Sequence, residues 1–401
     1  MRILVVCQYY YPEKFQINDI CEQLVKNGHH VTVLTGLPNY PMGDIPKEYL
    51  QGKKRDEIIN GVHVLRCFEI GRKPGVLGMA KNYLSYCISA SWKALWLKDE
   101  FDVVMIYQLS PVLMGIPAII YRWIHGLPTY LYCCDIWPES ARVLLKNDQS
   151  IAYKVIAKIS NYIYRHVDKI SVQSNSFIEY FTKYHKLELD KVVYIPQYSD
   201  SAYLNADFKP VDTKCVDFVF LGNIGIAQDV DCILKAVDLI REIDGFKVHF
   251  VGDGMFLEEA RKIVKDKQLE KIVKFYGRRP YEDMPIFYKM ADVCLATLRA
   301  GNLISETLPS KIQGYMAAGK PILGALEGSG MQVIKDSGCG ICVHSSDALA
   351  LSNAMKNMIN EKDNLVKYGE NGRKYFKDNF TKEIFMTNLE NVLNDVRRKG
   401  Q

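Results

Sequence analysis

The sequence predicts an α/β protein of two doubly wound, Rossmann-like domains. The chain has 401 residues, of which 48% are hydrophobic, and a chain of this length can fill two cores. Short apolar runs alternate with helical patterns from residue 3 onward, and the alternation restarts at residues 216–221 after a polar stretch without periodicity. This order is typical of parallel sheets whose strands are joined by helices. We therefore expect two α/β domains joined by a linker at residues 196–211.

The composition excludes several classes of protein. The formal net charge is +5, from 51 Lys and Arg against 46 Asp and Glu, so nothing indicates a nucleic-acid-binding polyelectrolyte. The 11 Cys include no Cys-x2-Cys pair, and no secretory signal precedes the first apolar run, which predicts a reducing cytoplasm and no zinc site. The longest apolar stretch, residues 112–120, is too short to cross a bilayer and predicts a buried helix.

The first β-α-β pattern places a polar loop where a ligand is expected. A strand at residues 3–7 is followed by a helical pattern at 17–25 and a second strand at 31–35. Ligands of doubly wound sheets bind beyond the carboxyl ends of the strands. The loop that carries Phe15 and Asn18 is therefore expected to line a binding cleft.

A second polar turn follows the strand predicted at residues 129–134. It contains Asp135, Trp137 and Glu139, a combination that can bind sugar hydroxyls through charge-assisted hydrogen bonds and a sugar ring through stacking. The alternative is that Asp135 or Ser140 only caps the next helix. Both interpretations remain open, and the ligand-binding one is favoured.

Residues 72–98 combine basic and aromatic side chains with an apolar helical face. Lys81, Lys93, Trp92 and Trp96 are among them. One interpretation is a helix that lies on an anionic membrane surface. The other is an ordinary amphipathic helix that packs on the sheet, and the sequence alone slightly favours this second interpretation.

The second domain opens with a glycine turn after its first strand. The turn carries Gly222, Asn223, Gly225 and Gln228, and glycines of this kind let backbone N–H groups approach a diphosphate closely. A later strand ends at Gly277, and the Arg278 that follows it either binds a ligand or is a solvated charge. Asp229 and Asp231 stand at a helix start without a supporting cluster of ligands, so no metal site is predicted.

Residues 306–321 are the segment with the clearest chemical signal. Ser310 and Gln313 form a capping-box pattern, and Gly319 ends a helix of about two turns. Lys311 stands in the first turn, where the helix dipole favours a carboxylate, and this misfit indicates a bound phosphate. The plain alternative is a capped surface helix. A loop with Glu327 follows the next strand and is a further possible anion or ribose site.

The segment resembles the donor-binding region of the retaining nucleotide-sugar glycosyltransferases of family four, which have the two-domain GT-B fold. Their Glu-x7-Glu signature is matched at Glu306, whereas the second position falls on Gly314, which cannot hold a ribose. The loop at residues 9–18, the Leu37–Pro41 run and the Asp-x-Trp-Pro-Glu motif at 135–139 resemble a branch that transfers aminodeoxy sugars such as L-fucosamine in bacterial capsule and O-antigen synthesis.

The resemblance implies a division of roles across the two domains. Glu306, Lys311 and Asp135 are expected to be catalytic, in a retaining reaction without a protein nucleophile or a metal cofactor. Residues expected to bind the UDP-sugar donor are Gly222, Asn223, Gly225, Gln228, Gly277, Arg278, Ser310 and Glu327. Residues expected to bind a polyprenyl-diphosphate-linked saccharide acceptor are Phe15, Asn18, Trp137 and Glu139.

The same resemblance implies how the chain is divided. Residues 1–199 are expected to form the acceptor domain and 200–380 the donor domain, with a last helix at 381–401 that packs back on the acceptor domain. The protein is expected to be cytoplasmic and peripheral on the inner face of the membrane. Two rival hypotheses remain: a nucleotide-sugar epimerase of the same fold, and a non-catalytic partner subunit that binds a sugar nucleotide.

Overall fold

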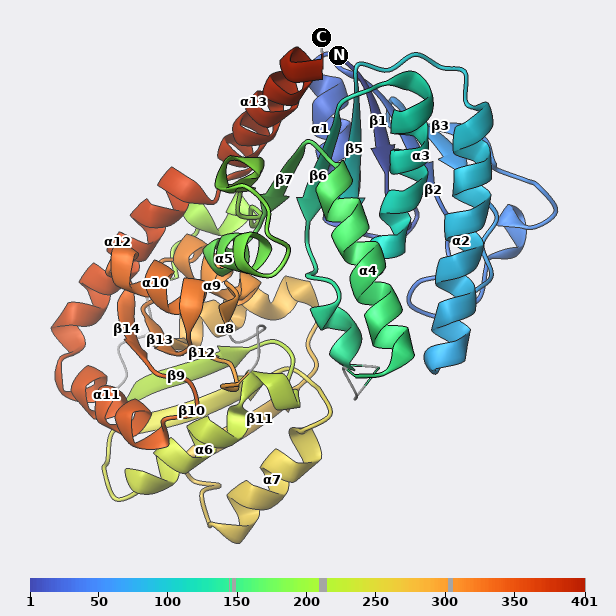
Figure 1. The fold of residues 1–401 in the computed structure, drawn as a ribbon. Coiled ribbons are helices and arrows are strands. Elements are labelled where there is room, and N and C mark those ends of the chain that lie inside the picture. The colour runs from blue at the N-terminus through green and yellow to red at the C-terminus, as the bar shows by residue number, and fades with distance from the viewer. Residues whose placement is uncertain (144, 146–148, 209–214, 302–305, 401) are drawn as a thin grey trace. The chain divides into compact units, whose positions relative to one another are not determined.

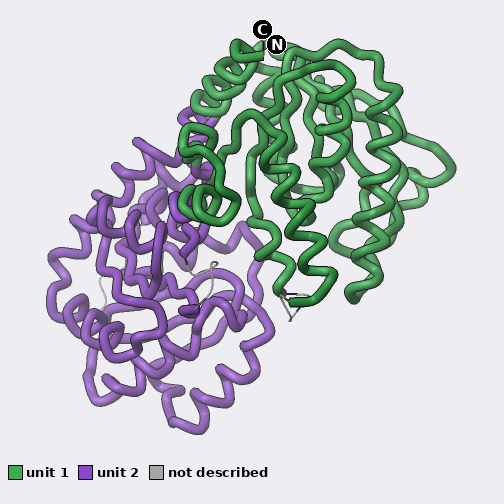
Figure 2. Tube along the Cα trace, in the orientation of Figure 1, with its two compact units in different colours: residues 1–173, 177–195, 386–401 green, residues 174–176, 196–385 purple. Residues whose placement is uncertain are grey.

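The computed structural model describes residues 1–143, 145, 149–208, 215–301 and 306–400. The chain forms two compact units, shown in Figure 2. Unit 1 contains Met1–Gln173, Phe177–Ile195 and Met386–Gln401, and unit 2 contains Ser174–Ser176 and Pro196–Phe385. The principal division thus lies between residues 195 and 196. The end of the expected linker, residues 209–211, lies outside the described residues.

Unit 1 is built on an eight-stranded sheet with the order β3-β4-β2-β1-β5-β6-β7-β8. All neighbouring strands are parallel except β3, which runs antiparallel to β4. Strand β1 is central and its residues 3–6 are fully buried, as expected of a parallel strand covered on both faces. The strands are β1 (Arg2–Val6), β2 (His30–Thr35), β3 (Asp56–Ile59), β4 (Val62–Arg66), β5 (Val103–Gln108), β6 (Thr129–Cys133), β7 (Lys169–Val172) and β8 (Val192–Tyr194).

Helices α2, α3 and α4 lie along one side of this sheet (Figure 1). The helices whose residues belong wholly or partly to unit 1 are α1 (Gln16–Lys26), α2 (Val76–Trp96), α3 (Ile116–His125), α4 (Ile151–His166), α5 (Asn175–Lys183) and α13 (Lys382–Gly400). The predicted helix at 112–120 begins as a 3-10 turn at Val112–Gly115 and continues as α3.

The C-terminal helix α13 is fastened to the segment after α1. The Glu390 carboxylate accepts a hydrogen bond from Asn27 Nδ2 at 2.7 Å and lies 3.2 Å from His29 Nε2.

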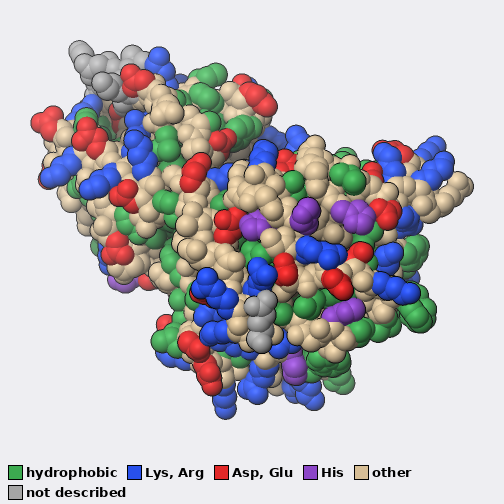
Figure 3. All heavy atoms as spheres, turned by 90° about the horizontal axis from the view of Figure 1, so that it is seen from above, with side chains coloured by type: hydrophobic (Ala, Val, Ile, Leu, Met, Phe, Trp, Pro, Cys, Tyr) green, Lys and Arg blue, Asp and Glu red, His purple; other side chains and the backbone are tan. Residues whose placement is uncertain are grey.

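Figure 3 looks at the molecule from above, and on this face histidine side chains (purple) lie among basic (blue) and acidic (red) ones. Mixed charges of this kind suit local pairing and do not form a surface of one sign.

Unit 2 is built on a six-stranded, fully parallel sheet with the order β11-β10-β9-β12-β13-β14. Its strands are β9 (Val216–Leu221), β10 (Phe246–Val251), β11 (Val273–Gly277), β12 (Val293–Thr297), β13 (Ile322–Ala325) and β14 (Gly340–Val343). Its helices are α6 (Val230–Leu239), α7 (Leu257–Asp266), α8 (Met284–Met290), α9 (Ser310–Ala317), α10 (Gly328–Ser337), α11 (Ala348–Asn360) and α12 (Lys362–Asn379). Two buried clusters fill this unit, one with side chains of α6, α7 and α11, the other with side chains of α8, α9 and α10.

The predicted fold class is confirmed, since each unit is a Rossmann-like α/β sheet. The strand order reverses between β1 and β5 in unit 1 and between β9 and β12 in unit 2. Loops at the carboxyl ends of these strands are the expected ligand positions in each unit. The sequence patterns did not predict several elements that the structure contains, among them β3, β4, β14, α5, α7 and α12.

Candidate functional site

The side chain of Lys311 ends in a buried amine at the carboxyl end of β9. Its Nζ lies 3.6 Å from the centroid of the Phe220 ring, and a Cβ added to Gly222 would lie 3.5 Å from it. This amine has no hydrogen-bond partner among the described residues. Burial lowers the pKa of Lys311 to about 7, against a smaller opposing effect of Cys294. A buried cation without an acceptor is costly, and an anionic ligand would supply one.

Helix α9 begins differently from the prediction. Pro309, with φ −65° and ψ 130°, occupies the N-cap position, and Ser310 is the first helical residue without a side-chain cap. The predicted capping box is therefore wrong. Pro309 has the fixed φ that suits a helix start, and its carbonyl accepts from Ile312 N–H at 3.0 Å. Gln313 is buried and donates instead to the carbonyl of Gln197. The first-turn N–H groups stay without a side-chain cap, beside Lys311.

The glycine turn after β9 packs closely against the turn after β10. Gly222 has φ +124°, and a Cβ added to Gly252 would lie 1.8 Å from the Gly222 carbonyl oxygen. Asn223 Nδ2 donates to Gln228 Oε1 at 3.0 Å, and a Cβ on Gly225 would lie within 2.7 Å of both side chains. The structure thus brings these donor-site candidates together in one turn, next to Lys311.

Arg299 is not a free positive charge for this turn. Its guanidinium lies 3.4 Å from the Asp229 carboxylate, and Asp229 also accepts from Ser346 Oγ at 2.6 Å. Asp229 occupies the N-cap position of α6 but makes no side-chain cap. Among the described residues, Lys311 is therefore the cation that contacts the turn.

Glu306 and Glu327 are close neighbours in unit 2. A Cβ on Gly328 would lie 2.5 Å from the Glu306 carbonyl oxygen, so the start of α10 approaches the loop before α9. The Glu306 side chain is exposed. The Glu327 carboxylate accepts from Ser345 N–H at 3.1 Å and lies 3.0 Å from His344 Nδ1.

Two other donor-site candidates, Gly277 and Arg278, lie farther along the sheet, and the Gly277 carbonyl accepts at 2.9 Å from the N–H of Gly252, which packs on Gly222. Gly277 ends β11, the edge strand of the sheet, and the exposed Arg278 follows it. Gly314 faces the core, because a Cβ there would lie 3.0 Å from the Tyr288 hydroxyl. A side chain at position 314 would therefore meet Tyr288.

In unit 1, Ser110 joins two of the predicted acceptor-site residues. Its hydroxyl donates to Asp135 Oδ2 at 2.7 Å and accepts from Trp137 Nε1 at 3.1 Å. Burial raises the pKa of Asp135, and the Ser110 hydrogen bonds oppose this rise. Sequence reasoning did not select Ser110, although it lies directly after β5, where the strand order reverses.

Trp137 and Glu139 have internal partners. The Trp137 ring is buried. The Glu139 carboxylate lies 2.7 Å from Arg142 Nε and accepts from the Tyr153 hydroxyl at 3.2 Å. The Asp135 carboxylate, by contrast, has the Ser110 hydroxyl as its side-chain partner.

The loop after β1 is held by Glu13. Its carboxylate accepts from the backbone N–H groups of Asn39 at 2.7 Å and Tyr40 at 2.5 Å. Asn18 is buried and its amide donates to the Glu13 carbonyl at 2.6 Å. Phe15 packs against Tyr40, with ring centroids 5.4 Å apart. Asn18 therefore shapes the loop, and Phe15 belongs to its aromatic surface.

A buried polar cluster that sequence reasoning missed lies beneath this loop. The Glu69 carboxylate accepts from Gln8 Nε2 and Asn82 Nδ2, both at 2.6 Å. Its second oxygen has no partner among the described residues, and burial raises the pKa of Glu69 to about 8. The segment around Glu69 shows no motif, so the sequence offered no signal for this cluster.

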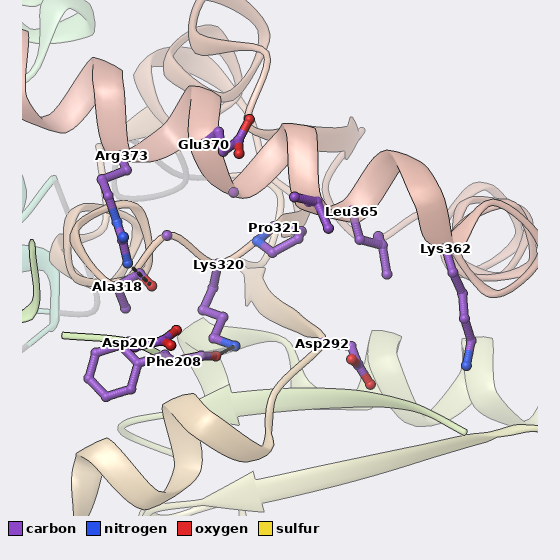
Figure 4. Close-up of a pocket in the computed structure, with 13 residues that line it drawn as sticks. Asp207, Phe208, Asp292, Ala318, Lys320, Pro321, Lys362, Leu365, Glu370 and Arg373 are labelled. Atoms are coloured by element: carbon purple, nitrogen blue, oxygen red, sulfur yellow. Dashed lines mark hydrogen bonds between the residues drawn. The ribbon is translucent and has the colours of Figure 1, made fainter. Parts of the chain in front are cut away.

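Unit 2 also contains a cavity of about 280 Å³ (Figure 4). It lies at the amino ends of β12 and β13, whereas the glycine turn follows the carboxyl end of β9. Lys320 donates to the carbonyls of Phe208 and Ala291, and Arg373 donates to that of Ala318 at 3.1 Å. These cations hold backbone segments together at the amino ends of β12 and β13. We assign this cavity a structural role.

Two further searches concern the described residues only. Within them, no group of three or more His, Cys, Asp or Glu side chains could hold a metal ion. In the same part of the chain, no helix is long and apolar enough to cross a membrane.

Two family models match consecutive parts of the chain. The model described as "Glycosyl transferase 4-like domain" matches residues 15–197, and the model described as "Glycosyl transferases group 1" matches residues 205–375. The first match covers most of unit 1 and includes Asp135. The second covers most of unit 2 and includes Lys311.

Three curated relatives of low identity align over two thirds or more of the chain. A probable glycosyltransferase, WbjE, of Pseudomonas aeruginosa is 26% identical over 69% of this chain and 70% of its own. The putative colanic acid biosynthesis glycosyl transferase WcaI of Escherichia coli is 24% identical over 99% of this chain and 100% of its own. The O-antigen chain mannosyltransferase C of Escherichia coli is 23% identical over 95% of each chain.

Solved structures support the fold. HepE of Anabaena, solved in complex with UDP, has a TM-score of 0.71 at 14% identity and covers 98% of this chain and 100% of its own. Sucrose-phosphate synthase of Thermosynechococcus elongatus has a TM-score of 0.70 at 16% identity, with 98% of each chain covered.

Proposed function

We propose that the chain is a two-domain glycosyltransferase of group 1, and that it transfers a sugar from a UDP-sugar to a lipid-linked saccharide during synthesis of a bacterial surface polysaccharide. The observation that carries the donor part is the buried Lys311 amine beside the glycine turn, which has no acceptor among the described residues. The relatives named for colanic acid and O-antigen synthesis support the surface-polysaccharide part.

The donor chemistry proposed for unit 2 is electrostatic. When the bond between the sugar and the diphosphate breaks, negative charge grows on the departing phosphate oxygen. The Lys311 cation and the N–H groups at the start of α9 are positioned to stabilise it, and such preorganised donors contribute strongly to catalysis. The backbone around Gly222 approaches the diphosphate, and Glu306 orients the sugar.

The role proposed for unit 1 is to position the acceptor hydroxyl group. Asp135, held by Ser110, accepts a hydrogen bond from the attacking hydroxyl group and orients it. The new bond forms between this oxygen and the sugar carbon on the face that the diphosphate leaves, and the hydroxyl proton passes to the leaving phosphate oxygen. Configuration is retained, no protein nucleophile is required, and no metal cofactor takes part.

The identity of the sugar is the finest part of the proposal. The Asp135-x-Trp137-Pro-Glu139 motif supports an N-acetylated aminodeoxy sugar such as N-acetyl-L-fucosamine. The acceptor is proposed to be linked to polyprenyl diphosphate, and the protein is proposed to work at the cytoplasmic face of the membrane, which it meets through residues 72–98.

A nucleotide panel tests the donor class. We would measure the thermal stability of the protein with UDP, GDP, ADP and several UDP-sugars, since a ligand that binds only the folded state raises its melting temperature. We expect stabilisation by UDP compounds alone. Stabilisation by GDP alone would contradict the UDP assignment. Several curated relatives are named mannosyltransferases, four of them GDP-mannose-dependent, so GDP-mannose belongs in the panel.

A second assay separates the proposal from its rivals. Purified protein, a UDP-sugar that binds, and membranes that contain lipid-linked saccharides are expected to release UDP and extend the saccharide. Conversion of the UDP-sugar into an isomer without acceptor would indicate an epimerase. Nucleotide binding without turnover on any acceptor would indicate a non-catalytic subunit.

A further inference from the structure

Unit 1 contains an apolar groove that the proposed chemistry does not use. It has a volume of about 360 Å³ and lies between α2 and α4, with walls completed by the Val112–Gly115 turn and the segment after β6. Figure 1 shows α2 (light blue) and α4 (green) on the same side of the sheet. Each lining side chain is apolar or aromatic, with Met79, Leu84, Leu113, Trp137, Val155 and Ile159 among them.

The groove is left open to water by the fold. Leu84 is 50% exposed and Val155 is 49% exposed, although both line it. Sugars and nucleotides need hydrogen-bonding groups, which these side chains do not offer. Moving a hydrocarbon chain from water to such an apolar wall lowers the free energy. The chemistry of the groove therefore selects a hydrocarbon chain.

The inner wall of the groove meets the acceptor-site cluster. The Trp137 ring lines the groove, while its Nε1 donates to Ser110, the residue that holds Asp135. A single molecule with a polar head at Asp135 and an apolar tail along Trp137 fits both surfaces at once.

A cation stands beside the same wall. The Arg72 guanidinium carbon lies 5.8 Å from the centroid of the Tyr83 ring, and Tyr83 lines the groove. No described carboxylate forms an ion pair with Arg72, whereas its neighbour Lys73 pairs with Asp44 at 2.9 Å. Arginine suits phosphate recognition, so a phosphorylated link between head and tail has a partner here.

We infer that this groove binds the isoprenoid chain of the lipid-linked acceptor, next to its diphosphate. The inference rests on the proposed function and adds where the lipid part of the acceptor is recognised. Exposed apolar side chains continue along α2 at Leu77, Trp92 and Trp96, so the rest of a long chain can stay in a lipid layer while its first units occupy the groove.

Two isoprenoid diphosphates test the inference by equilibrium binding to the full-length protein. Farnesyl diphosphate has a longer chain than isopentenyl diphosphate and the same head group. A buried methylene is worth about fourfold in affinity, so we expect farnesyl diphosphate to bind at least about tenfold more tightly. Equal affinity for the two would overturn the inference.

Variants of the groove sharpen the test. Leu84→Asp and Val155→Asp place a charge on half-exposed positions, where the fold tolerates it, and each is expected to weaken farnesyl diphosphate binding about tenfold or more. Matched controls are Ile88→Asp on α2 and Ile151→Asp on α4, which are 68% and 83% exposed and lie outside the groove. The controls are expected to bind like the unmodified protein.

Three other experimental outcomes would overturn the inference, and one of them would also overturn the proposed function. Unchanged binding in both groove variants would overturn the inference, and the UDP stabilisation of the same proteins would show that the proposed function survives. A concentration-dependent dimer that Val155→Asp dissociates would overturn it in favour of a second copy of the chain as the occupant. If the unmodified protein bound no nucleotide and transferred no sugar, the proposed function and this inference would both be overturned.

Discussion

Lys311 is expected to destabilise the folded protein and to promote sugar transfer. Replacing it by methionine removes a buried, unpaired cation, so Lys311→Met is expected to stabilise the free protein, by about 1–3 kcal/mol. The same change is expected to slow sugar transfer about tenfold or more, because a donor to the leaving diphosphate is lost. Thermal unfolding and initial rates, measured on the same preparation, check both effects.

A control variant distinguishes the loss of the charge at Lys311 from the loss of any one lysine charge. Lys335 is an exposed residue of α10, and Lys335→Met is expected to change neither quantity appreciably. Turnover of Lys311→Met equal to that of the unmodified protein would remove Lys311 from the mechanism.

The lowered pKa of Lys311 also predicts a proton linkage. The folded free protein has this pKa at about 7, below the ordinary value of 10.5, so between these values the unfolded chain binds more protons and stability rises with pH. A bound diphosphate restores the charged amine. We therefore expect UDP binding at pH 8 to take up a proton, and UDP affinity to fall as pH rises above 7.

Calorimetric titration in buffers of different ionisation enthalpy measures this uptake. The Lys311→Met protein is the matched control, and its binding enthalpy is expected to vary less between buffers. Equal proton uptake in both proteins would assign the linkage to another group.

Glu69 predicts the opposite dependence of stability on pH. Its pKa in the folded protein is raised from 4.5 to about 8, so the folded state binds more protons between these values and its stability falls as pH rises through them. Glu69→Gln keeps an oxygen that accepts from Gln8 and Asn82. We expect this variant to lose part of that fall, as seen by denaturant unfolding at pH 5 and pH 8. A parallel fall in both proteins would contradict the assignment.

These two residues also show what sequence reasoning can reach at this scale. Lys311 was noticeable because a cation in the first turn of a helix opposes the helix dipole. Glu69 was not, because its burial depends on Gln8 and Asn82, which come from elements far apart in the chain. The Ser110 link between Asp135 and Trp137 escaped prediction for the same reason.

Among the elements, α9 gives a direct test of side-chain direction. Gly314 faces the Tyr288 hydroxyl at 3.0 Å, in a buried cluster. Gly314→Glu is therefore expected to destabilise unit 2 by about 1–3 kcal/mol through overpacking and not to strengthen UDP binding. Gly314→Ala is the control, since it adds the Cβ without the carboxylate. Tighter UDP binding by Gly314→Glu at unchanged stability would show that this position reaches the ribose.

The elements that sequence patterns missed have physical reasons. Helix α12 carries glycines in its interior, which lower helix propensity, yet Gly369 is required where a Cβ would lie 2.2 Å from the Gly319 carbonyl oxygen. The β3–β4 hairpin sits at a sheet edge with a short, half-exposed strand, so its alternation is weak. The long buried strands of both sheets were predicted because their apolar runs are continuous.

At the scale of the whole molecule, α2 is the element proposed to meet the membrane. One of its faces packs inward through Tyr83, Tyr86 and Ala90, while other positions leave large apolar side chains exposed. Replacing Lys81 and Lys93 by Glu is expected to weaken binding to anionic vesicles, and the difference is expected to shrink as salt rises. Co-sedimentation with vesicles that contain anionic lipids measures this. Neutral vesicles are the control, and equal sedimentation of both proteins with anionic vesicles would leave α2 as a packing helix only.

The path of the chain through its two units has a consequence for engineering. Unit 1 is resumed at Met386 after unit 2, so unit 2 is an insertion within unit 1. A chimera that exchanges unit 2 with that of a relative needs two splice junctions, near 195/196 and 385/386. A single-junction hybrid would leave α13 from one parent opposite His29 from the other, and the Glu390 contacts would then depend on the match between parents.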